Sequence, residues 1–340
     1  MKIKYYLLAA AAILAVAACD TETDAPEQGN QANGNYWFIH GLVPKGIKSI
    51  GSDYYTENYD SNGRLTSYSS QDGGSATYTY NSDGYPATIV TKESYDGVLY
   101  TTRQTFEYKN GSKFCPYPMG PGNIFHIFEN GLAQGLSKVT WNSEEYGTTV
   151  MEYKFDGDKL TVSTSGGNRT MIDSLGREVP LVYDDLVIEY KGDYPYRFSQ
   201  EHEFIGPLTY QANGMFDTYV EGFYSWNPMY AGVVTMERTR TVNKNFKDRM
   251  LIDREVSKYY NEGESDPYDI ETIVYNYNEH GDEIREEVTH TAEHADRIIT
   301  NYEYVYDDKG NWIKMTANIQ NLSYPDYNNT WSSERQIVYY

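Results

Sequence analysis

The stretch Tyr304-Val-Tyr-Asp-Asp-Lys-Gly-Asn311 carries the pattern that decides the fold of this chain. An alternating strand ends in Tyr, an Asp and two polar residues follow, and a Gly precedes the next strand. The Asp side chain can accept a hydrogen bond from the backbone two residues on. The Gly supplies a positive φ without steric cost, as in a type I turn closed by a G1 bulge. The stretch therefore predicts a β-hairpin.

The same unit recurs along the chain, with copies at Tyr78–Tyr85 and Tyr275–Asp282 and a shorter one at Tyr59–Arg64. Turn signals also separate several strand-like runs, which are Gln104–Tyr108, Val150–Phe155, Val187–Tyr190, Thr272–Tyr277, Ile298–Tyr306 and Glu334–Tyr340. Regular short strands with turns between them predict an antiparallel all-β fold. We expect an up-and-down meander that closes into a barrel-like sheet, because closure removes edge strands. An open, twisted sheet is the alternative.

The Tyr-x-Tyr-Asp-x-x-Gly unit resembles the YD repeat of Rhs-type shell proteins. The matches cover four stretches, near residues 54–68, 76–92, 271–290 and 300–316. The region of about residues 112–270 departs from the pattern, so the continuity of the sheet is left open there. The resemblance brings no catalytic residue with it.

The amino terminus has the features of an export signal. Met1-Lys2-Ile3-Lys4 is basic, and the apolar run Tyr5–Ala18 is shorter than the about 20 residues that span a membrane. The run ends Val16-Ala17-Ala18-Cys19, which resembles the lipobox of bacterial lipoproteins. That resemblance implies that residues 1–18 are removed and that Cys19 carries a diacylglyceryl thioether. An ordinary signal peptide, cut after a small-x-small site, is the alternative.

Residues 20–34 contain no aliphatic or aromatic side chain other than alanine and proline. We expect residues 19–34 to form the lipidated cysteine and a flexible acidic tether, and residues 35–340 to form one tyrosine-rich β domain. The acidic start of the tether resembles the export signal of surface lipoproteins in Bacteroidetes, which implies an outer-membrane anchor and a domain facing the exterior. Anchor, tether and repeat together are similar to surface lipoproteins of Bacteroidales with unknown function, some of which have a porin-like fold.

The amino-acid composition excludes some classes of partner and limits how the domain can be stabilised. The formal net charge of −21 argues against nucleic acid, because binding its phosphates requires basic patches. The 36 tyrosines favour broad sheets with solvated faces over a compact aliphatic core. Cys115 is the sole cysteine after Cys19, so no internal disulfide can form. The mixed polar and apolar faces of Glu283–Thr291 argue against a barrel that spans the membrane.

Two patterns imitate metal sites. His290-Thr-Ala-Glu-His294 matches a zinc-protease motif, which needs both imidazoles on one face of a helix. The repeat predicts strand there, which would separate the imidazoles by about 13 Å. Asp60-Ser-Asn-Gly63 and Asp307-Asp308 resemble parts of calcium loops, yet Gln71 stands where an EF-hand needs Glu. We therefore predict hairpin turns, and neither a metal nor a cofactor.

Exposed aromatic rings could stack on sugars, and the candidates are Trp37, Trp141, Trp226, Trp312 and Trp331. Trp226 lies in an irregular aromatic stretch with Tyr224 and Tyr230, so these three are the predicted ligand-stacking residues, with packing as the alternative. The Pro/Gly-rich stretch Phe114–Asn123 reads as a connection or a binding loop. Cys115 lacks the basic surroundings that a nucleophile needs.

The functional expectation is a non-enzymatic surface lipoprotein that acts as a scaffold or a binding module. Its expected partners are the membrane, through the lipid, and an extracellular glycan or protein. The alternative is a glycan-binding accessory lipoprotein, motivated by the aromatic residues. A hydrolase would require two carboxylates that converge in a cleft.

Overall fold

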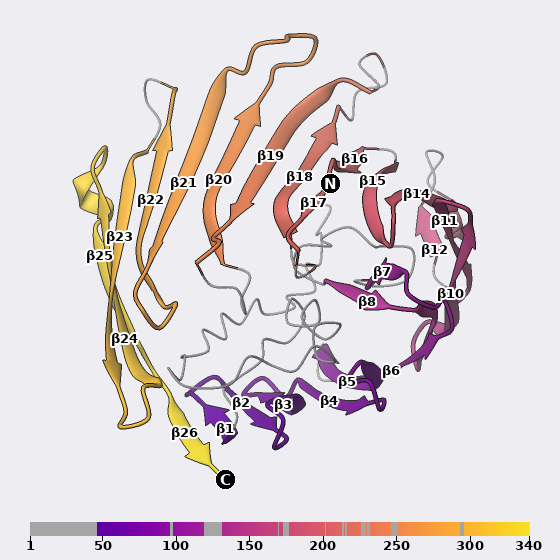
Figure 1. Ribbon diagram of the computed structural model, residues 1–340, viewed down its shortest axis with the longest axis horizontal. Helices are drawn as coiled ribbons and strands as arrows, with labels where there is room; N and C mark the ends of the chain where they lie inside the picture. Colours follow the sequence, from indigo (N-terminus) through magenta and orange to yellow (C-terminus); the bar gives the residue numbers. More distant parts are fainter. Residues whose placement is uncertain are drawn as a thin grey trace.

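The computed structural model describes residues 46–95, 98–118, 131–168, 170–172, 177–200, 202–212, 214, 216–225, 229, 232–245, 251–292 and 296–340. Almost all of their regular structure is antiparallel β (Figure 1). Among these residues no helix is long and apolar enough to cross a membrane. The predicted all-β fold is therefore confirmed.

One sheet of 22 strands contains most of the chain. Its first part comprises β1 (Ile47–Gly51), β2 (Tyr55–Tyr59), β3 (Leu65–Ser70), β4 (Ser75–Tyr80), β5 (Pro86–Tyr95), β6 (Val98–Tyr108), β9 (Leu136–Ser143), β10 (Gly147–Asp156), β11 (Lys159–Gly166), β14 (Leu186–Lys191) and β15 (Tyr194–Gln200). Its second part comprises β16 (Glu203–Ile205), β17 (Thr209–Tyr210), β18 (Phe216–Tyr224), β19 (Val234–Val242), β20 (Ile252–Tyr259), β21 (Asp269–Tyr277), β22 (Glu283–His290), β23 (Ile298–Tyr306), β24 (Trp312–Asn321), β25 (Asn329–Glu334) and β26 (Gln336–Tyr339). Two short pairs stand apart, β7 (Phe114–Pro116) with β8 (Leu132–Gln134), and β12 (Thr170–Ile172) with β13 (Glu178–Pro180).

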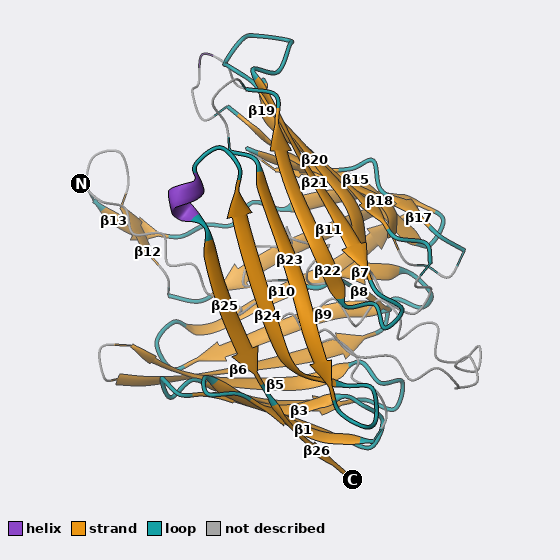
Figure 2. Cartoon of the chain, turned by 90° about the vertical axis from the view of Figure 1, so that its left-hand side faces the viewer, coloured by secondary structure: helices purple, strands orange, loops and turns teal. Residues whose placement is uncertain are grey.

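The sheet curls until its first and last strands meet. Strands that are neighbours in sequence pair along the meander, and β1 pairs with both β2 and β26. The last strand changes partner at Arg335: β25 pairs with β24, whereas β26 pairs with β1. Figure 1 shows the resulting ring, and Figure 2 shows β23, β24 and β25 face-on. The predicted closure into a nearly complete barrel is confirmed, and the sheet continues through much of the region that departs from the repeat.

The four predicted turns share one geometry. At the first, the Asp60 carboxylate accepts the N–H groups of Asn62 and Arg64, at 2.9 and 3.0 Å, and Gly63 has φ 77°. The same pair of side-chain bonds recurs at Asn81, Asn278 and Asp307. In each copy the tyrosine before the turn pairs across a register shift. The predicted hairpin turn with a bulge is therefore confirmed, and these Asp and Asn side chains serve the turn.

Side chains from later strands tie successive hairpins together. The accepting carbonyl lies two residues after the turn glycine, and the hydroxyl comes from the next hairpin. Tyr80 donates to Leu65 at 2.5 Å, Tyr108 to Pro86 at 2.7 Å, and Tyr304 to Glu283 at 2.7 Å. At the fourth turn the Arg335 guanidinium donates to the Trp312 carbonyl at 2.6 Å instead. These interhairpin bonds give many tyrosines a structural role.

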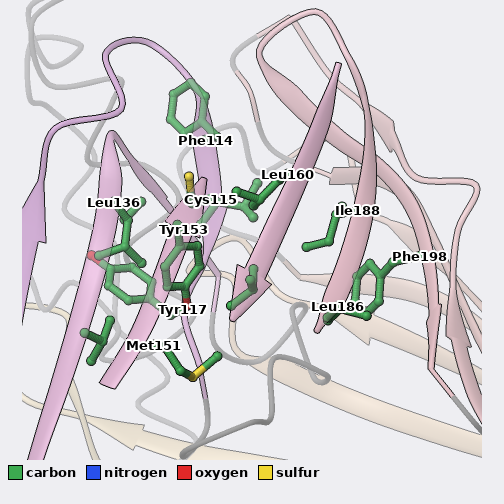
Figure 3. Close-up of a cluster of buried hydrophobic side chains, with 14 of the residues drawn as sticks. Phe114, Cys115, Tyr117, Leu136, Met151, Tyr153, Leu160, Leu186, Ile188 and Phe198 are labelled. Carbon is green, nitrogen blue, oxygen red and sulfur yellow. The ribbon is translucent and has the colours of Figure 1, made fainter. Parts of the chain in front are cut away.

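The main apolar core lies in the middle of the chain, where the β7–β8 pair packs against the sheet (Figures 1 and 3). The Phe114 N–H donates to the Asp193 carbonyl at 2.8 Å, and the Tyr190 hydroxyl donates to the Phe114 carbonyl at 2.8 Å. Leu136, Leu160 and Ile188 are fully buried in this cluster. The expectation of solvated faces without a compact core is therefore wrong for this part. Phe114–Pro116 forms a core strand, and residues 119–123 of the proposed loop lie outside the described residues.

Candidate functional site: a charged inner wall

Between β18 and β24 the inner face of the sheet changes from apolar to largely polar and charged. Residues paired directly across an antiparallel sheet point to the same face. Tyr219 belongs to the apolar core and pairs with Arg240, which pairs with Glu255. The same row continues through Ile273 and Val288. We call the polar residues on this face of β18–β24 the inner wall. They include Glu221, Arg238, Arg240, Glu255, Ser257, Asp269, Glu271, Glu283, Glu286, His290 and Tyr302.

Two arginines and two glutamates form the most buried part of the inner wall. The Arg240 guanidinium contacts Glu255 at 2.7 Å and Glu221 at 2.9 Å. Arg238 contacts the same carboxylates at 3.2 and 3.5 Å and donates to the Ser257 hydroxyl at 3.1 Å. The side chains of Arg240 and Glu255 are only 8% and 9% exposed. Because two positive charges meet two negative ones, the cluster is neutral, as buried ionic groups must be.

A second charged group surrounds His290 at the end of β22. Its Nδ1 lies 2.8 Å from Asp269, and its Nε2 lies 3.5 Å from Glu271. Burial opposes ionisation of Asp269, but the bonds from His290 and from the N–H groups of Thr291 and Ala292 lower the pKa of that carboxyl overall. His290 therefore lies on a strand, as predicted. His294 lies outside the described residues, and no metal-ligating cluster occurs within them.

Two further carboxyl groups interact on β22. Burial, and then the charge of Glu286, raise the pKa of Glu283 to about 7. Burial, and then Glu255, also raise the pKa of Glu286. Glu283 is thus protonated in about half of the molecules near neutral pH, and Tyr302 bonds to it. Such a group can exchange a proton within the physiological range.

The structure places the predicted aromatic candidates differently. Tyr224 ends β18, where its ring packs 5.1 Å from Phe204 and its N–H donates to the His202 carbonyl at 2.7 Å. Trp226 and Tyr230, like Trp37 and Cys19, lie outside the described residues. Of the other three tryptophans, Trp141 and Trp312 are buried and Trp331 is 44% exposed. Packing is therefore the role of Trp141 and Trp312, and the latter lies 3.6 Å from the Arg335 guanidinium.

Cys115 is fully buried in the core. Burial raises the pKa of its thiol to about 12, although bonds to Tyr190 and Asn110 oppose the shift. Because a thiolate is the reactive form, this thiol is a packing group. The prediction that Cys115 is no nucleophile agrees with this environment.

Sequence reasoning missed the Arg–Glu cluster of the inner wall. One signal was present, since Arg238-Thr-Arg240 places two arginines on one face of a strand. Glu221 lies 17 residues before Arg238, and Glu255 lies 15 residues after Arg240. Only the register of three strands brings these charges together, and no local motif encodes that register.

Comparisons with known proteins bear on the repeat. A family model described as RHS Repeat matches residues 59–94. This stretch contains the turns at Asp60 and Asn81, so the predicted resemblance to YD repeats is confirmed there. No protein of curated function matches the sequence.

The solved structures that match this chain include porin-like proteins. One from Bacteroides uniformis is 11% identical with a TM-score of 0.32, covering 87% of this chain and 99% of that chain. Another, from Bacteroides vulgatus, is 9% identical with a TM-score of 0.23 and the same coverage. The Photorhabdus luminescens Tc holotoxin pore is 11% identical with a TM-score of 0.21, covering 82% of this chain and 15% of that chain. Residues 59–94 of this chain are similar to an RHS repeat and lie in an antiparallel sheet that is nearly closed into a barrel.

Proposed function

We propose that this protein is a surface lipoprotein, anchored to the outer membrane through Cys19, whose β domain is a non-enzymatic scaffold that binds an extracellular glycan or protein. The scaffold role is supported by the hydrogen bonds that the side chains of the repeat make within the sheet. The turn Asp and Asn side chains bond their own turns, and the tyrosine hydroxyls bond the preceding hairpin. The repeat therefore builds a rigid surface and leaves its most frequent polar groups engaged in structure.

The outward face of β22–β24 supports a tethered domain. Arg285 pairs with Asn301 and so lies on the face opposite Glu286. On this face Glu287 contacts Arg285 at 3.1 Å and Arg297 at 2.7 Å. Charged side chains on a lipid-facing surface are costly near the bilayer centre. These ion pairs are suited to water, which favours attachment through lipid over passage through the bilayer.

Lipid attachment is tested by metabolic labelling. Cells that express the full chain with an alkyne-bearing fatty acid should yield a labelled protein, and Cys19→Ala should abolish the label. Cys115→Ala is the matched control and should keep it. An unlabelled wild-type chain, or a label that survives Cys19→Ala, would contradict the anchor.

Surface orientation is tested by protease treatment of intact cells. Digestion of the domain in intact cells, with a periplasmic marker protein left whole, supports a domain that faces the exterior. Protection until the outer membrane is opened would place the domain in the periplasm and would refute this part of the proposal.

The interacting carboxyls Glu283 and Glu286 favour one second candidate, a hydrolase that uses them as acid and base. Its test requires first that the purified chain cleaves a glycan or ester substrate. The turnover of the Glu286→Gln variant is then compared with that of the wild type. Loss of turnover with an unchanged melting temperature would favour the hydrolase over the scaffold. Unchanged turnover would remove the pair from consideration.

A further inference from the structure

A shallow groove of about 610 Å³ lies over β23, β24 and β25. Its position follows from strand pairing, because Asn301, Asn318 and Thr330 are direct cross-strand partners. Asn301 also pairs with Arg285, so this row is on the outward face, away from the inner wall. Figure 2 shows the three strands from that side. The polar residues that line the groove include Asn301, Glu303, Asn318, Gln320, Asn328 and Thr330.

The lining has the chemistry that recognises hydroxyl groups. Each amide side chain offers two N–H donors and one carbonyl acceptor, and a carboxylate offers acceptors only. Within the row, the Thr330 hydroxyl donates to the Asn318 carbonyl oxygen at 3.1 Å, which leaves the Asn318 amino group to a ligand. A sugar ring presents hydroxyls that both donate and accept at close spacing. A row of amides across adjacent strands can bond several such hydroxyls at once.

One end of the groove is formed by a preorganised loop. The loop contains the 3₁₀ turn η3 (Pro325–Tyr327), drawn purple in Figure 2, and Asn328 both follows that turn and lines the groove. The buried Asn321 fixes the loop: its side-chain oxygen accepts the N–H groups of Ser323 and Tyr324, and its backbone N–H donates to Asn328 at 2.7 Å. A loop held in this way loses little entropy when a ligand binds.

The loop presents two exposed aromatic rings. Tyr324 and Tyr327 are 45% and 73% exposed, and their centroids lie 6.4 Å apart with the rings edge to face. An exposed tyrosine ring offers an apolar face to the C–H face of a sugar. Tyr327 directly precedes Asn328, which lines the groove, so this ring and the amide row could together provide the two contacts that a pyranose needs.

The charges near the groove select against anions. The lining contains Glu303 and no lysine or arginine. The Arg285 guanidinium donates to the side-chain oxygen of Asn301, which lines the groove, at 3.4 Å, but it is already paired with Glu287. A sulfated or phosphorylated ligand would therefore meet a carboxylate without a compensating free cation.

We propose that this groove is a binding site for a neutral oligosaccharide, held by the amide row and by stacking on Tyr327. The site rests on the proposed binding scaffold, whose ligand class it names. It does not depend on the lipid, so it can fail without affecting the anchor at Cys19. It is also distinct from the predicted cluster of Trp226, Tyr224 and Tyr230.

The test uses the full chain, purified in a sugar-free detergent, on an array of neutral α- and β-glucans, mannans, xylans and galactans, with sulfated glycans beside them. Calorimetry then gives the Kd for the strongest neutral binder. Tyr327→Ala should weaken that Kd about tenfold through lost stacking, and Asn318→Ala about fivefold through lost hydrogen bonds. Tyr54→Ala, which removes a 77% exposed ring elsewhere, should leave the Kd unchanged.

Trp331→Ala provides a second control, because Trp331 pairs with Ala317 and lies on the opposite face of β25 from Thr330. Neutral-glycan binding that falls in both groove variants and persists in both controls establishes the site. Three results would overturn it: no neutral glycan bound on the array, tighter binding of a sulfated glycan, or a Kd that both groove variants leave unchanged.

Discussion

The middle of the chain and its carboxy-terminal part form the same kind of hairpin, but they place different side chains on the inner face of the sheet. In the middle, β7 and β8 cover the inner face, and fully buried side chains such as Leu160 and Ile188 meet there. On β18–β20 the inner face carries Arg238, Arg240 and the two glutamates that they contact. The comparison teaches that turns and interhairpin bonds set the sheet, whereas the inward residues decide what the sheet encloses.

The largest effect should come from breaking charge balance in the carboxy-terminal part. Arg240→Met leaves Glu221 and Glu255 with one arginine between them, and removal of one partner from a buried ion pair costs about 3–5 kcal/mol. Urea unfolding measures the loss. The control is Lys314→Met, whose pair with Glu334 is solvent-exposed and should cost less than about 1 kcal/mol. Equal losses in the two variants would mean that the inner wall is hydrated like the outside.

The same cluster gives a sharper test through its partner. If the cost of Arg240→Met is that of an unpaired charge, then Arg240→Met with Glu255→Met should recover much of the lost stability. A double variant that is as unstable as the sum of the single ones would show that packing, and not charge, holds this part together.

A somewhat smaller effect should come from opening the apolar part. Ile188→Ala removes a side chain that is fully buried, and such truncations cost about 2–5 kcal/mol in unfolding free energy. The matched control in the other part is Ile284→Ala, because Ile284 is 39% exposed and should cost less than about 1 kcal/mol. Similar costs at both sites would remove the contrast between the two parts.

These two parts also differ in how far sequence could predict them. The turns at Asp60, Asn81, Asn278 and Asp307 were predictable, because each is encoded in six to eight adjacent residues. The strand Ile298–Tyr306 was predicted with the bounds that the structure shows. Local signals suffice where a hairpin's register depends on its own turn.

The features that several strands build together could not be predicted in the same way. Strand β7 lies in the Pro/Gly-rich stretch that reads as a connection or a binding loop, and its burial depends on contacts with β9 and β15. The groove on β23–β25 joins Asn301, Asn318 and Thr330 from three strands, and asparagine has low strand propensity. Contacts of this kind follow from the order of strands in the closed sheet.

A pH effect of intermediate size should come from Glu283 in the carboxy-terminal part. Since the fold raises the pKa of Glu283 to about 7, the native state holds a proton there that the unfolded chain releases above its ordinary value near 4.5. Stability should therefore fall as pH rises from about 4.5 through 7, by about 2 kcal/mol after allowance for solvent screening. Glu283→Gln should flatten this dependence and be the more stable protein at pH 8. Urea unfolding at pH 5 and pH 8 measures both, and an unchanged pH slope in the variant would contradict the assignment.

The smallest effect concerns what the two parts share. Tyr108→Phe in the first half of the sheet and Tyr304→Phe near its end each remove one interhairpin bond, to the carbonyls of Pro86 and Glu283. Tyr108→Phe also removes a longer contact of 3.3 Å with the Tyr117 hydroxyl. Each should cost about 1 kcal/mol in unfolding free energy, the usual net value of one hydrogen bond. Tyr54→Phe, at a 77% exposed ring, is the control and should cost nothing measurable. Near-equal costs for the two variants would show that the bond belongs to the repeat and is independent of an apolar or charged filling. A cost at Tyr304 alone would mean instead that the charged part relies on its hydroxyls because it lacks a covered core.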